Sequence, residues 1–146
     1  MKDKNRPYSR LEINKVFTKV KAEMHAKALL RGEKRGIDKA VYIDLYTGEE
    51  LLGGDPYAYE HIRSAEAIFN KYKSNLTDQQ IALVVNCPEN VGVTLSTLNN
   101  SKGKKAMEDW IDNRQNVSNY GVDMKLTMAN LKKADKGIEK KVSELI

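Results

Sequence analysis

Histidine is the side chain best suited to accept a proton near neutral pH, and this sequence contains two, His25 and His61. His25 lies between Met24 and Ala26 in a stretch with helical spacing, which favours a structural or surface role. His61 directly follows Glu60. A carboxylate binds hard cations such as Mg²⁺, and a neutral imidazole can take a proton from water. The Glu-His pair is therefore the first candidate for metal-dependent chemistry.

Position in the chain limits what this pair can do. Neighbouring residues of a regular strand point to opposite faces, so Glu60 and His61 can serve one site only if the strand ends or bends there. The Gly53-Gly54-Asp55-Pro56 break before the pair and the helix expected after it allow such a bend. A lone Glu-His dipeptide arises often by chance, so its sequence context has to carry the argument.

That context is an ordered series of four short motifs: LYTGEEL at 45–51, YEHI at 59–62, PEN at 88–90 and TLNNSKG at 97–103. In this order the motifs resemble those of the HNH (ββα-metal) endonucleases. The closest similarity is to the HNH domains of CRISPR effectors and of bacterial and phage HNH nucleases. In that family a hairpin leads to an acidic residue followed by His and Ile, then an E-N pair, then an Asn near a helix start. The resemblance covers about residues 40–108.

The resemblance implies a role for each matched residue. His61 would be the general base, and Glu60 and Asn99 would hold one divalent metal, Mg²⁺ by expectation, with Mn²⁺ or another ion open. Asn90 would brace the loop through backbone hydrogen bonds, and the Lys102 ammonium would contact a phosphate. Metal at the scissile phosphate and the leaving oxygen, with His61 activating water, would give phosphodiester hydrolysis. DNA is the expected substrate, and RNA stays open.

Two departures from the family pattern stand close to the pair. Arg63-Ser64 follows His61-Ile62 where the family often has proline, and Glu60 stands where the family more often has Asp or His. Neither change removes a functional group, so we expect an active enzyme. Nearby cationic residues are further candidates for neutralising phosphates: Arg63, Lys102, Lys104 and Lys105. Lysines at a helix start are also often simply solvated.

The elements that must position these residues are expected to be mostly helical. A helix is expected over about 10–31, with Ser9 as its N-cap and with Gly32 and Gly36 ending it. The β-prone segment 40–46 is expected to pair with a second strand over about 57–62. Further helices are expected over Ala65–Tyr72, from Thr77 to about Val85 with a Thr77/Gln80 capping box, over about 104–112 and over about 122–145. Segments 86–92 and 113–121 are expected to be loop and connection, and Gly137 weakens the last helix.

We therefore predict an α+β, mainly helical fold, in which a small ββα-metal hairpin-plus-helix unit packs on N- and C-terminal helices. A chain of 146 residues fits a single domain, with an N-terminal basic helical region (1–39), an HNH core (40–112) and a C-terminal helical extension (113–146). The ββα unit alone is too small to be stable, so the flanking helices should supply its core.

Charge is unevenly distributed along the chain. Residues 1–40 carry 12 Lys and Arg against 5 Asp and Glu, residues 41–100 carry 3 against 8, and residues 101–146 carry 10 against 7. Basic flanks suit a polyanion such as nucleic acid, and an acidic middle suits a cation, although charge runs are also typical of solvated helix faces. Cys87 is the only cysteine, so an intramolecular disulfide and paired-Cys structural zinc are not expected.

Several biological settings fit the same residues. No apolar stretch approaches the roughly 20 residues that span a bilayer, and the N-terminus lacks the apolar core of a signal peptide, so we expect no membrane association and cytoplasmic synthesis. One alternative is the toxin domain of a secreted polymorphic toxin, delivered into target cells and bound by an immunity protein. Another is a catalytically inactive ββα scaffold that binds nucleic acid or regulates a partner, in which Glu60, His61 and Asn99 do not converge.

Overall fold

The computed structural model describes residues 3–146 and shows an α+β, mainly helical protein with two small antiparallel sheets. Its elements are, in chain order, α1 (Leu11–Lys34), β1 (Val41–Ile43), β2 (Glu50–Leu52), β3 (Tyr57–His61), α2 (Ala65–Tyr72), α3 (Asp78–Val85), the 3-10 helix η1 (Pro88–Asn90), β4 (Val91–Leu95), α4 (Ser96–Lys102), α5 (Met107–Asp112), α6 (Arg114–Tyr120) and α7 (Met124–Leu145). No helix among these residues is long and apolar enough to cross a membrane.

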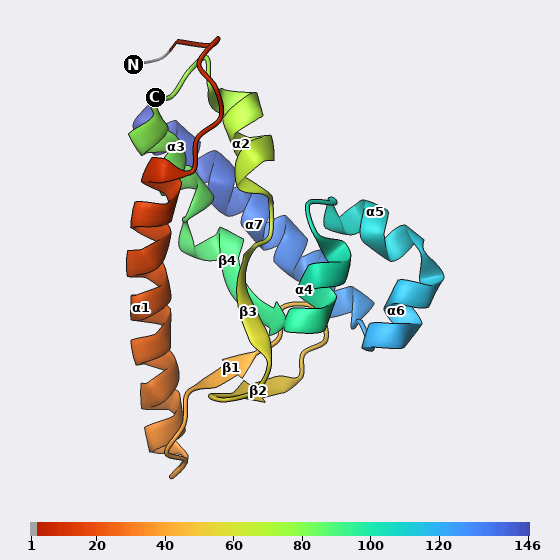
Figure 1. The fold of residues 1–146 in the computed structure, drawn as a ribbon. Coiled ribbons are helices and arrows are strands. Elements are labelled where there is room, and N and C mark those ends of the chain that lie inside the picture. Colours follow the sequence, from red (N-terminus) through yellow and green to blue (C-terminus); the bar gives the residue numbers. More distant parts are fainter. Residues whose placement is uncertain (1–2) are drawn as a thin grey trace.

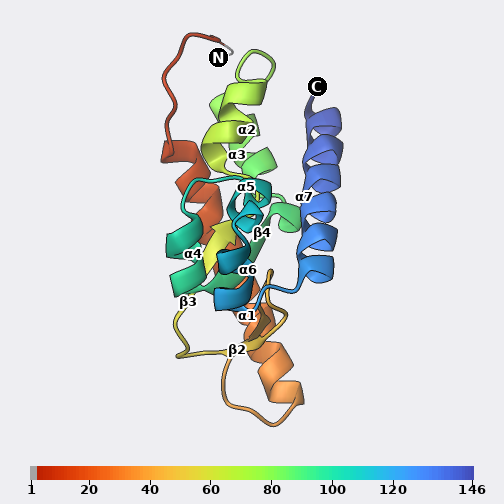
Figure 2. The same cartoon turned by 90° about the vertical axis from the view of Figure 1, so that its right-hand side faces the viewer.

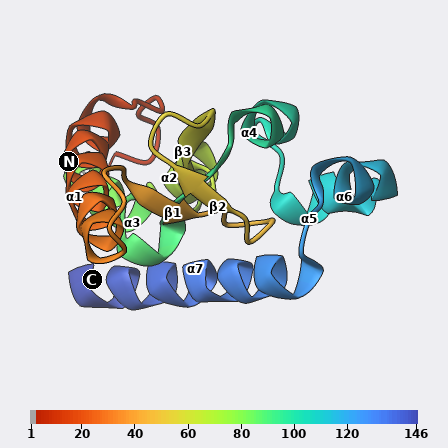
Figure 3. The ribbon, with the colours of Figure 1, turned by 90° about the horizontal axis from the view of Figure 1, so that it is seen from below.

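The long helices frame the molecule. In Figure 1, α1 runs down one side while α5 and α6 lie at the opposite end. Figure 2 shows α7 extended along one flank, and in Figure 3 it runs along one edge of the molecule, from the side of α1 towards α5 and α6. Contacts of α1 with α3, and of α7 with α3 and η1, join the N- and C-terminal helices to the centre of the chain.

Strand pairing differs from the predicted hairpin. The segment 40–46 does not pair with 57–62: β1 pairs with β2, and β3 pairs with β4, which follows it after α2, α3 and η1. The first pairing is local because a tight turn closes it, with Asp44 N–H donating to the Glu49 carbonyl (2.8 Å) and Gly48 N–H to the Asp44 carbonyl (3.1 Å). The predicted loop 86–92 is therefore only partly loop, since η1 and the start of β4 occupy it.

The β3–β4 ladder is covered by a different helix on each face. Alternation along the strand puts Tyr57, Tyr59 and His61 on one face and Ala58 and Glu60 on the other. On the first face, Met24 and Ala28 of α1 belong to the apolar cluster that includes Tyr59 and Val93. The second face meets α4, which packs on both strands directly after β4 ends. His61 can therefore contact α1, and Glu60 can contact α4.

Several helix predictions are confirmed and others need correction. The Ala65–Tyr72 helix and the Thr77/Gln80 capping box are present as expected. The segment 113–121, predicted as a connection, contains α6, and the run before Lys104 forms α4. Ser9 is not the N-cap, which is Arg10, although Ser9 Oγ accepts a hydrogen bond from the Leu11 N–H (3.2 Å).

Gly32 does not end α1, which continues to Lys34. A Cβ at Gly32 would lie 1.9 Å from the Lys39 carbonyl oxygen, so glycine is required there for the close return of the chain. Gly36, with φ of +71°, takes the left-handed conformation that turns the chain after the helix. The prediction was wrong about Gly32 because close packing, and not helix breaking, explains it.

Candidate functional site

His61 is the last residue of β3 and faces α1. Its ring lies 4.2 Å from the Phe17 ring, centroid to centroid, with 41° between the planes. Its Nε2 is 2.8 Å from Asn86 Oδ1. Every buried side-chain nitrogen or oxygen within residues 3–146 has a hydrogen-bond partner, and the hydrogen bond of the His61 ring runs through Nε2. The other ring nitrogen, Nδ1, has no hydrogen-bond partner among these residues and is therefore not completely enclosed.

The surroundings of His61 keep its imidazole neutral. Burial lowers the pKa of His61 to about 4, and the positive charges of Arg10 and Lys21 on and beside α1 act in the same direction, while the hydrogen bond with Asn86 opposes them. At neutral pH the ring is thus an uncharged imidazole with one nitrogen held and the other not completely enclosed. A neutral imidazole can accept a proton, but a pKa of about 4 makes this ring a weaker base than a free histidine.

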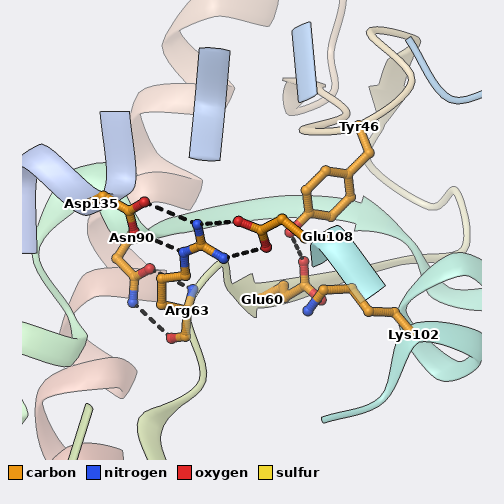
Figure 4. A network of polar contacts seen from close by, with 7 residues as sticks. All are labelled: Tyr46, Glu60, Arg63, Asn90, Lys102, Glu108 and Asp135. Atoms are coloured by element: carbon orange, nitrogen blue, oxygen red, sulfur yellow. Dashed lines mark hydrogen bonds and ion pairs between the residues drawn. The ribbon is translucent and has the colours of Figure 1, made fainter. Parts of the chain in front are cut away.

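Glu60 points to the opposite face of β3, towards α4. One carboxylate oxygen accepts a hydrogen bond from the Tyr46 hydroxyl, and the other lies 3.1 Å from the Lys102 ammonium. Figure 4 shows the carboxylate between these two partners. Glu60 is 7% exposed and Lys102 is 4% exposed, so the ion pair is buried. Burial raises the pKa of Glu60, and the Lys102 charge and the Tyr46 hydrogen bond act against that rise.

Asn99 lies on the same helix as Lys102, one turn earlier. Residues three apart on a helix are neighbours on its surface, so Asn99 belongs to the part of α4 beside the Glu60–Lys102 pair. Its side chain is half-buried. Leu98, which precedes it, is fully buried and anchors α4 in the apolar cluster that contains Tyr46 and Trp110. Packing of Leu98 therefore fixes the helix that carries both Asn99 and Lys102.

Glu60 offers a carboxylate of the type that binds a hard cation, but both of its oxygens already have partners, Tyr46 and Lys102. Carboxylate and amide oxygens are ligands of the kind that Mg²⁺ takes, but the polar contact of Glu60 with α4 is made by Lys102, three residues after Asn99. A carboxylate this buried requires a positive partner. The Lys102 ammonium is that partner in this structure. Glu60 and the Asn99–Lys102 segment of α4 are thus brought together, while His61 leaves β3 on the other face. No cluster of three or more His, Cys, Asp or Glu side chains suited to a metal occurs within residues 3–146.

Asn90 holds the chain just beyond His61. Its Oδ1 accepts a hydrogen bond from the Arg63 N–H (2.7 Å), and its Nδ2 donates to the carbonyls of Arg63 (3.1 Å) and Val85 (2.9 Å). The Ile62 N–H also donates to the Asn90 carbonyl (2.8 Å). These are backbone contacts of the kind that the HNH resemblance implies for this residue. They tie the end of β3 to the end of α3.

The cationic residues near Glu60 and His61 differ in their contacts with carboxylates. The Arg63 guanidinium binds both oxygens of Glu108 (2.7 and 2.8 Å) and both oxygens of Asp135 (2.8 and 3.0 Å), as Figure 4 shows. It links β3 to α5 and α7, and its charge is already matched by two carboxylates. Lys104 is exposed and lies 3.6 Å from Glu66, and Lys105 is exposed. His25 is exposed on α1, as expected of a surface residue.

Three residues of the site were not identified from the sequence. Phe17 is one of several apolar residues at helical spacing, and nothing marks it as the neighbour of a histidine. Asn86 falls in a segment that the sequence assigns to a loop. Tyr46 is part of the LYTGEEL motif, but its fully buried hydroxyl group could be linked to Glu60 only through the fold.

Comparisons with known protein families, with curated proteins and with solved structures found no match for this chain.

Proposed function

We propose that this protein is a metal-dependent endonuclease of the HNH type that hydrolyses phosphodiester bonds, with His61 as the general base. The observation that carries the proposal is the state of His61: a neutral imidazole with one nitrogen hydrogen-bonded to Asn86 and the other not completely enclosed. A general base requires a nitrogen lone pair within reach of water, and Nδ1 is the ring nitrogen without a hydrogen-bond partner within residues 3–146.

The second support is the succession of β3, β4 and α4. Here an antiparallel pair is followed at once by a helix, although it is not the pair of 40–46 with 57–62 that the sequence predicts. The Glu60 carboxylate contacts that helix at Lys102, three residues after Asn99. In the proposed enzyme Glu60 and Asn99 would hold the divalent ion. Because the ladder puts Glu60 and His61 on opposite faces of β3, the end of the strand would have to turn for both to act on one phosphate. When bound, such an ion offsets the negative charge that develops on the phosphate and on the leaving oxygen.

The residues of the chain divide the remaining work. His61 accepts a proton from the attacking water at its open nitrogen, and Asn90 fixes the backbone that follows His61. Lys102 neutralises Glu60 in the free protein, so a cation at Glu60 would release its ammonium to contact a substrate phosphate. Lys104 and Lys105 lie just beyond α4 and add exposed positive charge next to it.

The test is cleavage of supercoiled plasmid in the presence of Mg²⁺, Mn²⁺ or EDTA. We expect nicking or cutting with either metal, none with EDTA, and a loss of at least about 100-fold for His61→Ala, the scale at which a general base contributes. His25→Ala is the matched control, because it removes the only other histidine from an exposed position, and it should cleave like the wild type. Equal cleavage by the two variants would contradict the assignment of His61.

A second candidate function is that of an inactive ββα scaffold that binds nucleic acid. The observation in its favour is that both oxygens of Glu60 already have partners, Tyr46 and Lys102, on the face of β3 away from His61. This candidate predicts that folded wild-type protein binds DNA or RNA but cleaves neither with any metal. It also predicts no heat of Mg²⁺ or Mn²⁺ binding in calorimetry, where the nuclease should bind one ion that Glu60→Gln loses.

A further inference from the structure

Asn86 connects His61 to two helices outside the β3–β4–α4 unit. It is the residue that ends α3, and it is 4% exposed. Its side-chain Nδ2 donates to the carbonyl of Ala82 on α3 (2.8 Å) and to the carbonyl of Ile13 on α1 (3.1 Å). Its Oδ1 faces His61 Nε2. Every polar atom of this buried amide is therefore used.

These two donated bonds fix which way the amide of Asn86 points. Backbone carbonyl oxygens can only accept hydrogen bonds, so the NH₂ group has to face Ile13 and Ala82. The reversed amide would set Oδ1 against two carbonyl oxygens and would lose both bonds. The atom presented to His61 is consequently the oxygen, and the orientation follows from the hydrogen-bond network.

The orientation of Asn86 in turn fixes the proton on His61. An amide oxygen can only accept, so Nε2 of His61 must be the nitrogen that carries hydrogen. A neutral imidazole has a single N–H, which leaves Nδ1 with a lone pair. Nδ1 is also the nitrogen that is not completely enclosed. The basic atom and the accessible atom of the ring are therefore the same.

We infer that Asn86 is a positioning residue that selects the Nε2–H form of His61 and so makes Nδ1 the atom that accepts the proton of the attacking water. The catalytic part of this inference rests on the nuclease function proposed above. The water proton moves to Nδ1, and the hydroxide oxygen forms the bond to phosphorus. The leaving oxygen departs with the electron pair of the broken bond and takes a proton from solvent. The Nε2–H bond to Asn86 then holds the imidazolium that forms.

The same contacts make α1 part of the site. Ile13 supplies a carbonyl that holds Asn86, and Phe17, one turn further along α1, stacks on the His61 ring. On the Phe17 ring lies the Lys21 ammonium, 4.5 Å from its centroid. The imidazole is thus fixed at Nε2 by α3 and on one face by α1, which leaves its open edge at Nδ1.

The direct test is ¹⁵N NMR of the full chain labelled at histidine nitrogens, near pH 7. The two histidines are distinguished with the His25→Ala variant. We expect His61 to give the signals of a protonated Nε2 and an unprotonated Nδ1, whereas a protonated Nδ1 in the wild-type protein would overturn the inference. This readout needs neither metal nor nucleic acid, so it is decided separately from the nuclease function.

The role of Asn86 is tested with Asn86→Ala. We expect His61 signals averaged between the two neutral forms, and kcat for plasmid cleavage reduced about tenfold or more with KM little changed. Asn130→Ala is the matched control, because this half-buried amide also donates to a backbone carbonyl, that of Leu45, but does not touch His61. It should keep wild-type signals and kcat.

Two outcomes would contradict the assignment to Asn86. One is an Asn86→Ala protein that is folded and keeps the wild-type His61 signals and kcat. The other is an equal loss of kcat in Asn130→Ala, which would mean that any weakened amide has this effect. If Asn86→Ala does not fold, the wild-type spectrum still decides which nitrogen carries the proton. In a further outcome, the wild-type protein shows Nε2–H on His61 but cleaves neither DNA nor RNA. That result would overturn the nuclease function and support the selection of the Nε2–H form by Asn86.

Discussion

Because His61 is kept neutral in the folded protein, its ionisation is coupled to folding. Its pKa falls from 6.5 in the unfolded chain to about 4 in the folded one, so below pH 6.5 the unfolded chain binds the proton more strongly. The contribution of His61 to the free energy of unfolding is therefore complete above pH 6.5 and is lost as the pH falls from 6.5 towards 4. The loss is at most about 3 kcal/mol, because solvent reaches part of the ring.

This pH dependence is measured by urea unfolding of the wild type and of His61→Gln between pH 7.5 and 4. We expect the difference in unfolding free energy between them to shrink or reverse as the pH is lowered. His25→Gln should follow the wild-type curve at every pH, since His25 is exposed. Parallel curves for wild type and His61→Gln would show that the ring is not held neutral by the fold.

The Glu60–Lys102 pair should show the stability pattern of a buried ion pair. In Lys102→Met the Glu60 carboxylate loses its positive partner while staying buried, and we expect a loss of about 3–5 kcal/mol. The double variant Glu60→Gln/Lys102→Met removes both charges and should recover most of that loss. Lys104→Met, which breaks an ion pair whose lysine is 89% exposed, should cost less than about 1 kcal/mol in the same denaturant unfolding experiment.

Equal destabilisation of Lys102→Met and Glu60→Gln/Lys102→Met would contradict this expectation. The loss would then come from the packing of the lysine stem and not from the unpaired charge of Glu60. The same three proteins also report on the proposed cation site. An added divalent ion should stabilise Lys102→Met more than the wild type, because it would then have no ammonium to displace from Glu60.

At the scale of elements, Gly137 of α7 illustrates how a neighbouring segment overrides helix propensity. Glycine is about 1 kcal/mol less favourable than alanine inside a helix, which is why the sequence indicates a weak point there. In the structure a Cβ at Gly137 would lie 2.5 Å from the Cβ of Glu89, the middle residue of η1. The absence of a side chain lets α7 approach the segment that leads into β4.

We therefore expect Gly137→Ala to destabilise the protein by about 1–3 kcal/mol in denaturant unfolding, despite its better helix propensity. Lys136→Ala, at the adjacent exposed position of the same helix, should change stability by less than about 0.5 kcal/mol. A Gly137→Ala protein as stable as the wild type, or more so, would mean that α7 can move away from η1 at no cost.

How far the elements could be predicted depends on how local their causes are. The Ala65–Tyr72 helix and the Thr77/Gln80 capping box follow from neighbouring residues and were predicted correctly. The partner of β3 was not, because it lies 30 residues further on, in the short stretch Val91–Leu95 between a loop and a helix. The motifs singled out Glu60, His61 and Asn90 as candidates, and their roles stay predictions. The sequence could not identify Asn86, whose role depends on two carbonyls from separate helices.

At the scale of the whole molecule, α7 joins two apolar clusters. Ile138 and Val142 belong to the cluster formed with α1, α2 and α3, while Leu131 and Ala134 belong to the cluster around Trp110. Arg63 adds a polar link from the end of β3 to α5 and α7. A helix that contributes to both clusters should make the chain unfold as one cooperative unit.

Two probes can check this cooperativity. Trp110 is the only tryptophan and is 1% exposed, so its fluorescence reports on the second cluster, whereas far-UV circular dichroism reports on all helices. We expect the same denaturation midpoint for both signals. Leu131→Ala should lower the free energy of unfolding by about 2–5 kcal/mol, and both signals should report the same loss. A fluorescence transition that precedes the dichroism transition would show that α4, α5 and α6 unfold separately.

The hydrogen bond from Asn86 to the Ile13 carbonyl also limits how this protein can be engineered. Under the proposed function, the motif-bearing segment 40–108 invites transplantation into other scaffolds as a self-contained module. Such a graft would carry His61 and Asn86 but leave behind Ile13 and Phe17, so its histidine would lose one of its supports and its stacking partner. A portable version has to begin at α1, and any molecule fused to or docked on that helix would act on the histidine through it.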